Sequence, residues 1–287
     1  MQAVAPKIAD LIERGYKVVL THGNGPQVGA TLLRHEAAKN VVPPFPLDAC
    51  GAETQGLIGY MIQQALRNEL KLRRIEKHVV TVVTRVTVDS SDQAFEHPTK
   101  PVGPFYTKQE ADELSRRLPG LTVKEDSGRG YRRVVPSPDP KIIVEGPAIR
   151  ALVNAEFVVV STGGGGIPIV EESGYAHGVE AVIDKDLAGQ RLATLIGADV
   201  FVILTDVEGA CLNFGTPEQK VIGEVTSDNL QGYLSKGHFR DGSMAPKVKA
   251  ALRFVEHGGE RAIIAELSKL VEALEGRTGT QILRSRD

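Results

Sequence analysis

Short apolar runs rich in β-branched residues alternate with amphipathic segments of helical length along this chain of 287 residues. A run that is apolar throughout is typical of a strand buried on both faces, as in a parallel sheet with helices on each side. The alternation therefore predicts an α/β fold with a mainly parallel sheet. The runs are YKVVLT (16–21), VVTVVTRVTV (79–88), EFVVVST (156–162), DVFVILTDV (199–207), RAIIAEL (261–267) and TGTQIL (278–283).

The segments between these runs carry apolar residues at helical spacing. In the longest of them, Leu57, Met61, Ala65 and Leu66 are predicted to share one helix face. The predicted helices cover about 3–14, 28–38, 51–72, 147–154, 184–198, 226–235 and 242–257, with a last helix ending near Leu274.

Residues 89–140 interrupt the alternation. Seven prolines gather there, and SGRG (127–130) separates short strand candidates. The segment is too long for a simple loop in a compact domain. We interpret it as a small lobe inserted in a single domain that spans 1–287.

Composition excludes several classes of protein. Lys and Arg number 34 against 36 Asp and Glu, so no chain-wide basic footprint for nucleic acid is present. No stretch approaches the ~20 apolar residues of a membrane span, and the first residues lack a signal-peptide pattern. The two cysteines, Cys50 and Cys211, cannot build a disulfide framework. We therefore expect a cytoplasmic protein that binds neither nucleic acid nor membranes.

Two glycine-rich turns follow predicted strands. HGNGPQ (22–27) lies between a strand and a helix, where backbone N–H groups suit an anion, although a tight turn that binds nothing has the same pattern. STGGGGIP (161–168) carries four consecutive glycines. Four glycines cost conformational entropy on folding, which favours a close approach of the backbone to a phosphate or oxyanion over a flexible linker.

Three lysines stand out beside these turns. Lys185 lies between Asp184 and Asp186, and Lys247 lies in the first turns of a helix that Ser243 can cap. Lys100 lies in the proline-stiffened HPTKPVGPF (97–105). Ammonium groups of this kind can neutralise charge on a phosphoryl group. A solvated charge cluster at a helix start and a rigid surface loop remain the alternatives.

Two glycine turns and three lysines, without a dominant His or Cys constellation, together favour phosphoryl transfer. That chemistry depends on positioning and on charge stabilisation. The sequence lacks the GxxxxGK[ST] pattern, the protein-kinase signature, GxGxxG and zinc-ligand spacing.

Several segments, in order along the chain, resemble the carbamate kinases of the amino acid kinase superfamily. The most specific are PTKPVGPF and SGRGYRRVVPSP, and others are HGNGPQVG, PLDACGAETQGLIGY, GGGGIPIV, GVEAVIDKD, ILTDVEGAC and GHFRDGSMAPKV. The resemblance implies a three-layer αβα sandwich with a mainly parallel open sheet and a protruding subdomain at 89–140. It also implies a homodimer and a Mg²⁺-dependent exchange of a phosphoryl group between ATP and carbamate, giving ADP and carbamoyl phosphate.

The resemblance also implies roles for single residues. Lys185 and Lys247 are expected to contact the nucleotide phosphates, Lys185 also the transferred group, and Asp186 is expected to orient both lysines. Lys100 is expected over the carbamate or the transferred phosphate. The N-terminal half is expected to carry the carbamate side and residues 180–287 the nucleotide side, with no metal ligand assigned. The expected anion cradle is Gly23, Asn24, Gly25, Gly163, Gly164 and Gly165, and the expected nucleotide contacts include Thr205, Asp206, Val207, Ser243 and Met244.

The sequence departs from the family in two places. The carbamate kinases open with a strand that ends in a Gly-Gly-Asn turn, and this sequence begins inside what resembles the following helix. We therefore expect poor activity and poor stability of the chain as written. Tyr131 stands where the family commonly has Trp, a change expected to affect side-chain contacts only. A catalytically impaired relative that binds nucleotide and another amino acid kinase remain as alternatives.

Overall fold

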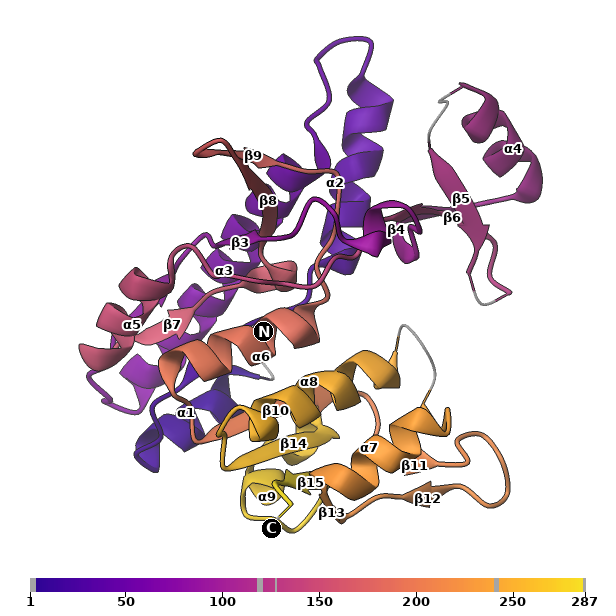
Figure 1. Cartoon of the computed structure of the whole chain (residues 1–287). Coiled ribbons are helices and arrows are strands. Elements are labelled where there is room, and N and C mark those ends of the chain that lie inside the picture. Colours follow the sequence, from indigo (N-terminus) through magenta and orange to yellow (C-terminus); the bar gives the residue numbers. More distant parts are fainter. Residues whose placement is uncertain (1–3, 118–120, 127, 240–242, 286–287) are drawn as a thin grey trace.

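The computed structural model describes residues 4–117, 121–126, 128–239 and 243–285. Its central sheets are sandwiched between two layers of helices, with the N-terminal and C-terminal parts side by side (Figure 1). The predicted α/β class with mainly parallel open sheets is confirmed. Residues 3 and 242, where two predicted helices begin, and Ser127 lie outside the described residues.

The N-terminal part is built on a parallel sheet in the order β1-β7-β2. One face is covered by α1 (Ala5–Glu13) and α3 (Leu47–Leu72), and the other by α5 (Gly146–Asn154) and α6 (Lys185–Ile196). Val158 faces the first layer and Val159 the second, as strand geometry requires. The three strands are β1 (Val19–Leu20), β7 (Val158–Val160) and β2 (Val79–Thr81).

The apolar run 79–88 forms two strands instead of the single strand predicted. After β2 the chain bends, and β3 (Arg85–Thr87) joins a different sheet, where it pairs in parallel with β8 (Ile167–Glu172). β8 turns back into an antiparallel partner, β9 (Tyr175–Gly178), which the sequence analysis missed. The strand is interrupted at Thr84, because the backbone N–H and carbonyl of this residue are hydrogen-bonded to the side chain of Gln55 in α3.

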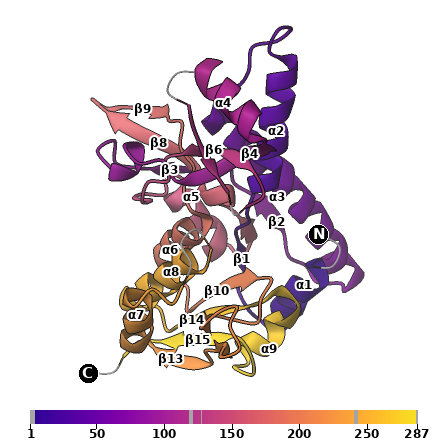
Figure 2. The same cartoon turned by 90° about the vertical axis from the view of Figure 1, so that its right-hand side faces the viewer.

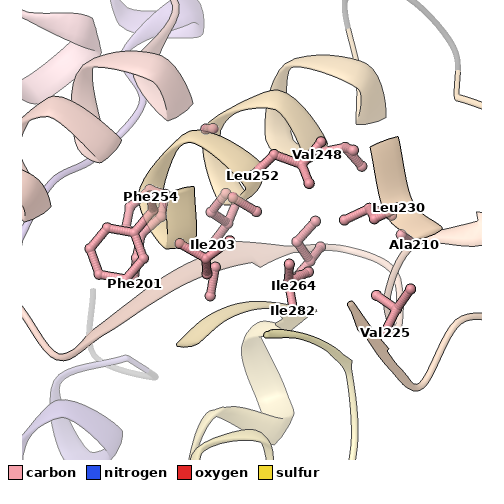
Figure 3. Packing of buried hydrophobic residues seen from close by; sticks show 14 of the residues in the cluster. Phe201, Ile203, Ala210, Val225, Leu230, Val248, Leu252, Phe254, Ile264 and Ile282 are labelled. Atoms are coloured by element: carbon pink, nitrogen blue, oxygen red, sulfur yellow. The ribbon is translucent and has the colours of Figure 1, made fainter. Parts of the chain in front are cut away.

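The C-terminal sheet has the order β10-β14-β15-β13. β14 is parallel to β10 and antiparallel to β15. Figure 3 shows the core between this sheet and α8 (Met244–Glu256), where the rings of Phe201 and Phe254 lie 5.6 Å apart between centroids. Its strands are β10 (Val200–Thr205), β13 (Glu224–Thr226), β14 (Arg261–Glu266) and β15 (Thr280–Leu283), and its other helices are α7 (Ser227–Ser235) and α9 (Leu270–Leu274).

The remaining elements are short or lie at the margins. They are α2 (Gly25–Ala38), the hairpin of β11 (Cys211–Leu212) and β12 (Lys220–Val221), and the 3-10 turns η1 (Gln93–Phe95), η2 (Gly163–Gly165) and η3 (Leu267–Lys269).

The edge strands of the two main sheets, β1 and β10, lie near each other in the centre of the molecule (Figure 2). β1 and β10 are both terminal strands of their sheets within the described part of the chain. α6 spans both, because Gly189 lies against the ring of Phe201 and the methyl of Thr21. Figure 2 shows β1 and β10 near each other in the middle of the molecule. Edge strands leave backbone N–H and C=O groups open to pairing with a further strand.

Residues 100–135 form a lobe with its own antiparallel sheet, in the order β4-β6-β5, and one helix (Figure 1). The ring of Phe105 lies against two guanidinium groups, those of Arg129 at 4.9 Å and Arg132 at 5.1 Å. The lobe consists of β4 (Lys100–Tyr106), α4 (Lys108–Arg117), β5 (Thr122–Glu125) and β6 (Tyr131–Val135).

The segment that follows the lobe, at Asp139 and Pro140, is hydrogen-bonded to two helices of the main body. Arg253 of α8 donates to Oδ1 of Asp139 at 2.5 Å. Arg191 of α6 donates to the carbonyl of Pro140 at 3.0 Å. The base of the lobe is thereby tied to α6 and α8 together.

Candidate active site

The two glycine turns meet at one edge of the N-terminal sheet. β1 and β7 are parallel, with Leu20 opposite Val160, so their carboxyl ends lie together. The turn at 22–24 follows β1, and the turn at 161–166 follows β7. In open α/β sheets, ligands bind in the crevice at this end of the strands.

The N-terminus of α6 points into the same region. Lys185 is the first residue of that helix, and its Cδ lies 3.3 Å from the position that a Cβ on Gly23 would occupy. The glycine therefore allows the backbone of the first turn to lie close against the lysine stem. The turn 22–24 and the lysine, far apart in sequence, form one site.

Asp186 brings two of the three predicted lysines together. Nζ of Lys185 donates to its Oδ1 at 2.7 Å, and Nζ of Lys247 donates to its Oδ2 at 2.9 Å. The Asp186 side chain is only 8% exposed, and that of Lys247 only 14%. α6 and α8 precede the parallel strands β10 and β14, so their N-termini lie at the same sheet edge.

Lys100 reaches this region from the lobe. Its Nζ donates to Oδ2 of Asp184 at 2.8 Å, while the other oxygen of Asp184 caps α6 through the amides of residues 186 and 187. Burial favours a higher pKa for the Asp184 carboxyl, but the Lys100 ammonium and the two amides outweigh it and hold that pKa below its ordinary value. Asp184 is therefore a charged anchor for the third lysine, a role that the sequence analysis did not assign.

The glycine run begins with a strained turn. Thr162 adopts a left-handed conformation at φ +54°, followed by positive φ at Gly164, Gly165 and Gly166. A Cβ on Gly164 would overlap the side-chain amide of Asn24, and one on Gly165 would overlap the carbonyl of Ile183. Glycine is required at both positions because neighbouring groups occupy the space of a side chain.

Not every amide of the expected cradle is open to an anion. Gly164 N–H donates to the carbonyl of His22 at 2.7 Å, and Gly165 N–H donates to the carbonyl of Thr162 at 3.1 Å. In the described part of the chain, the amides of Gly23, Asn24, Gly25 and Gly163 make no hydrogen bond. These four amides are free donors, and Gly23 among them lies against the stem of Lys185, whereas Gly164 and Gly165 allow close contact. Gly25 begins α2 with open space beside it.

His22 lies against the glycine run. A Cβ on Gly163 would overlap its Nε2, and its Nδ1 lies 3.1 Å from the carbonyl oxygen of Gly23. Burial lowers the pKa of His22, and the interaction with Gly23 only partly opposes that shift. The imidazole therefore favours its neutral form in this turn.

The residues expected on the nucleotide side lie at the carboxyl end of β10 and the start of α8. Thr205 Oγ1 donates to Oδ1 of Asp206 at 3.1 Å, and Val207 follows. Ser243 occupies the N-cap position of α8, but its side chain makes no capping hydrogen bond, in contrast to our expectation. Met244 packs against the C-terminal core. No described contact joins residues 205–207 to the lysines.

Several buried polar residues behind the turns were missed by the sequence analysis. Thr54 and Gln55 lie on the buried face of α3, and Thr84 lies between β2 and β3. The signal was present, because Thr54 is four residues from both Cys50 and Ile58 and so occupies a core position of the helix. A polar residue at an apolar position is an indication of a buried hydrogen-bond network.

The described residues contain no group of three or more His, Cys, Asp or Glu side chains able to hold a metal ion. The two carboxylates of the site, Asp184 and Asp186, are already bound to lysines. The lysine ammonium groups and the free backbone amides of this site are suited to binding phosphate groups.

Comparisons with known proteins agree with this geometry. The model of the amino acid kinase family matches residues 1–266. The chain is 58% identical to a carbamate kinase of Thermococcus kodakarensis, over 99% of this chain and 91% of the relative, and 57% identical to one of Pyrococcus furiosus, over 99% and 90%. The solved structure of a carbamate kinase from Giardia lamblia bound to AMP-PNP superposes with a TM-score of 0.92 at 47% identity, covering 99% of this chain and 90% of that one.

The chain therefore belongs to the amino acid kinase family. Within that family it is a phosphotransferase of the carbamate kinase type.

Proposed function

We propose that Lys100, Lys185 and Lys247 surround the phosphoryl group that passes between ATP and carbamate. The observation that carries this proposal is the Asp186 carboxylate, which holds Lys185 and Lys247 together beside the glycine turns. An oxygen of carbamate attacks the terminal phosphorus of ATP as the bond to the ADP oxygen breaks, and carbamoyl phosphate forms. Carbamate is already an anion, so the transfer needs no enzymic base.

The positions of the three lysines support a separate role for each. Lys185, whose stem lies against Gly23, contacts the transferred group. Lys247, at the start of α8, contacts the phosphates of the nucleotide. Lys100, delivered by the lobe, covers the carbamate side. Fixed positive charges of this kind stabilise the negative charge on the oxygens of a phosphoryl group in transfer.

The nucleotide occupies the side of the site formed by the C-terminal sheet. Thr205, Asp206 and Val207 lie at the carboxyl end of β10, and Ser243 and Met244 begin α8. Because α6 and α8 start at that same edge, a nucleotide bound there directs its phosphates toward Lys185 and Lys247.

Magnesium fits this site as a companion of the nucleotide. Mg²⁺ is commonly held by substrate phosphates, water and one or two carboxylates. The carboxylates of Asp184 and Asp186 are neutralised by lysines, so phosphate oxygens are the better ligands beside them. When bound, the ion supplies further neutralisation of phosphate charge, and we assign it no protein ligand.

A coupled assay of ATP formation from carbamoyl phosphate and ADP tests the proposal. We expect turnover that requires Mg²⁺ and falls sharply in Lys185→Ala. Binding of ADP without turnover under any of these conditions favours the alternative, a catalytically impaired relative that binds nucleotide.

We also propose that two copies of the chain associate through α3. The predicted apolar face of this helix is divided, because Leu66 is buried whereas Leu57 and Met61 are each 47% exposed. With Tyr60, 64% exposed, they form one exposed apolar patch at i, i+3 and i+4 spacing. We expect a dimer in sedimentation experiments and a monomer for Tyr60→Glu. A wild-type monomer would overturn this proposal.

We also propose that the enzyme acts in the cytoplasm, where ATP is available; both cysteines are buried free thiols, which suits a reducing compartment. Among the described residues, no helix combines the length and apolar character that crossing a membrane requires. Fractionation of cells that express the tagged chain tests this location.

A further inference from the structure

A buried chain of hydrogen bonds connects α3 with the glycine turn. The side-chain amide of Gln55 makes two bonds to the backbone of Thr84: Nε2 donates to its carbonyl at 3.1 Å, and Oε1 accepts from its N–H at 2.9 Å. Gln55 is 2% exposed and Thr84 is fully buried. A paired amide at this depth fixes the backbone where β2 gives way to β3.

Thr84 passes this constraint to the turn. Its hydroxyl donates to the carbonyl of Val82 at 2.7 Å and accepts from the N–H of Thr162 at 3.0 Å. Thr162 has the left-handed conformation that begins the glycine run, an arrangement that costs a non-glycine residue energy. Its own hydroxyl is buried without a partner in the described part of the chain. The backbone N–H of Thr162 is thus held by the Thr84 hydroxyl, and the Thr162 side chain adds no hydrogen bond of its own.

A second branch begins at the neighbouring residue of α3. Oγ1 of Thr54 accepts from Nδ2 of Asn24 at 3.0 Å, and the Asn24 amide lies against Gly164. Adjacent residues of one helix thus support both turns of the site. The first branch ends at Thr162 and the second lies against Gly164, so the two branches reach the residues on either side of the free Gly163 amide.

We propose that Gln55 and Thr84 are positioning residues that hold Thr162, and with it the Gly163 amide, in place for the transferred phosphoryl group. Neither side chain touches substrate in this arrangement, and both act through the backbone of the turn. The inference rests on the proposed role of the turn as an anion cradle.

The central test compares Thr84→Val with Thr84→Ser. Valine removes the hydroxyl and keeps the shape, and serine restores it. Thr87→Val is the matched control, because the buried Thr87 hydroxyl accepts from the amide of Ile142 at 3.1 Å, on a segment away from the turn. Gln55→Met supplies an independent variant if Thr84→Val does not fold.

We expect Thr84→Val to raise KM for carbamoyl phosphate and lower kcat, with kcat/KM reduced roughly 10-fold to 100-fold. The Kd of ADP should stay unchanged, Thr84→Ser should recover most activity, and Thr87→Val should behave as wild type. Hydrogen exchange of the Thr162 amide should accelerate in Thr84→Val and Gln55→Met only. Kinetics of Thr84→Val equal to those of Thr87→Val, or unchanged exchange at Thr162, would overturn the inference.

The exchange measurement separates this inference from the proposed function. A wild-type chain without turnover would contradict the function, whereas exchange at Thr162 would still report on the hydrogen bond. An active wild type with an insensitive Thr84 would contradict the positioning role alone.

Discussion

Lys185 and Lys247 are bound to opposite oxygens of a single carboxylate, that of Asp186. The two lysines come from different helices, so their ammonium groups are fixed with respect to each other before any substrate binds. A preorganised pair of charges costs little reorganisation when phosphate charge develops between them.

Lys185→Ala should lower kcat by about 10²–10³, because one preorganised charge is worth that much in typical active sites. Asp186→Asn should lower kcat as well, since both ammonium groups lose their common anchor. Steady-state assays of ATP formation measure both effects. Lys249→Ala, on the exposed side of α8, is the control and should keep wild-type kinetics. Wild-type turnover in Lys185→Ala would remove this lysine from the mechanism.

Lys100→Ala should impair the use of carbamoyl phosphate while leaving the affinity for ADP largely intact. The lysine comes from the lobe, and its partner Asp184 lies at the N-terminus of α6. Isothermal titration with ADP and the KM for carbamoyl phosphate separate the two sides of the site. Lys108→Ala, exposed on the same lobe, serves as the matched control. An equal loss of ADP affinity would contradict the assignment.

Gly164→Ala should nearly abolish activity and destabilise the protein, because the new methyl group would overlap the side-chain amide of Asn24. Gly174→Ala isolates the backbone contribution. That glycine also has positive φ, in the turn between β8 and β9, but nothing lies within 4 Å of its added Cβ. The control should cost only about 1–2 kcal/mol of unfolding free energy. Equal losses in thermal melts of the two variants would show that crowding is unimportant.

Stability should fall as the pH drops from about 7.5 to about 5, in part because of His22. Burial lowers the pKa of this imidazole in the folded state. The unfolded state therefore binds more protons between the folded and unfolded pKa values, and the stabilisation present at higher pH is lost on acidification. His22→Asn should reduce this slope of Tm against pH, whereas His177→Asn, exposed on β9, should not. An unchanged slope in His22→Asn would contradict the prediction.

A polypeptide of residues 1–287 should melt at a lower temperature, and turn over more slowly, than the same chain extended by a strand that ends in a Gly-Gly-Asn turn. Such a strand can pair with the free edges of β1 and β10. Differential scanning calorimetry and kcat on matched samples measure both effects. Equal Tm and equal kcat in the two versions would refute the prediction.

The alternation of apolar runs and helical segments was sufficient to predict the fold class, because buried parallel strands leave a strong signal. The ends of the strands, in contrast, depend on individual hydrogen bonds, which the pattern of residue types does not predict. The run at 79–88 is rich in β-branched residues from end to end, yet the side chain of Gln55 interrupts the strand at Thr84. Neither strand of the β8–β9 hairpin was predicted, and all four residues of β9 are exposed and lack the apolar pattern of a buried strand.

The three candidate lysines were selected from their neighbours in sequence, but only some of their partners were anticipated. Asp186 was expected to orient both Lys185 and Lys247 only through the family resemblance. The ion pair of Lys100 with Asp184 joins two segments that are remote in sequence, and no local pattern predicts it. Leu57 and Met61 have the spacing of core residues but point outward, since periodicity identifies a face without stating what covers it.

The hydrogen bonds at Asp139 and Pro140 also restrict how the active site can open. Lys100 travels with the lobe, while Arg191 and Arg253 belong to the helices that begin near Lys185 and Lys247. An outward movement of the lobe would either break these hydrogen bonds or move α6 and α8 with it. Through these bonds, any outward movement of the lobe would also act on the two helices that carry Lys185 and Lys247.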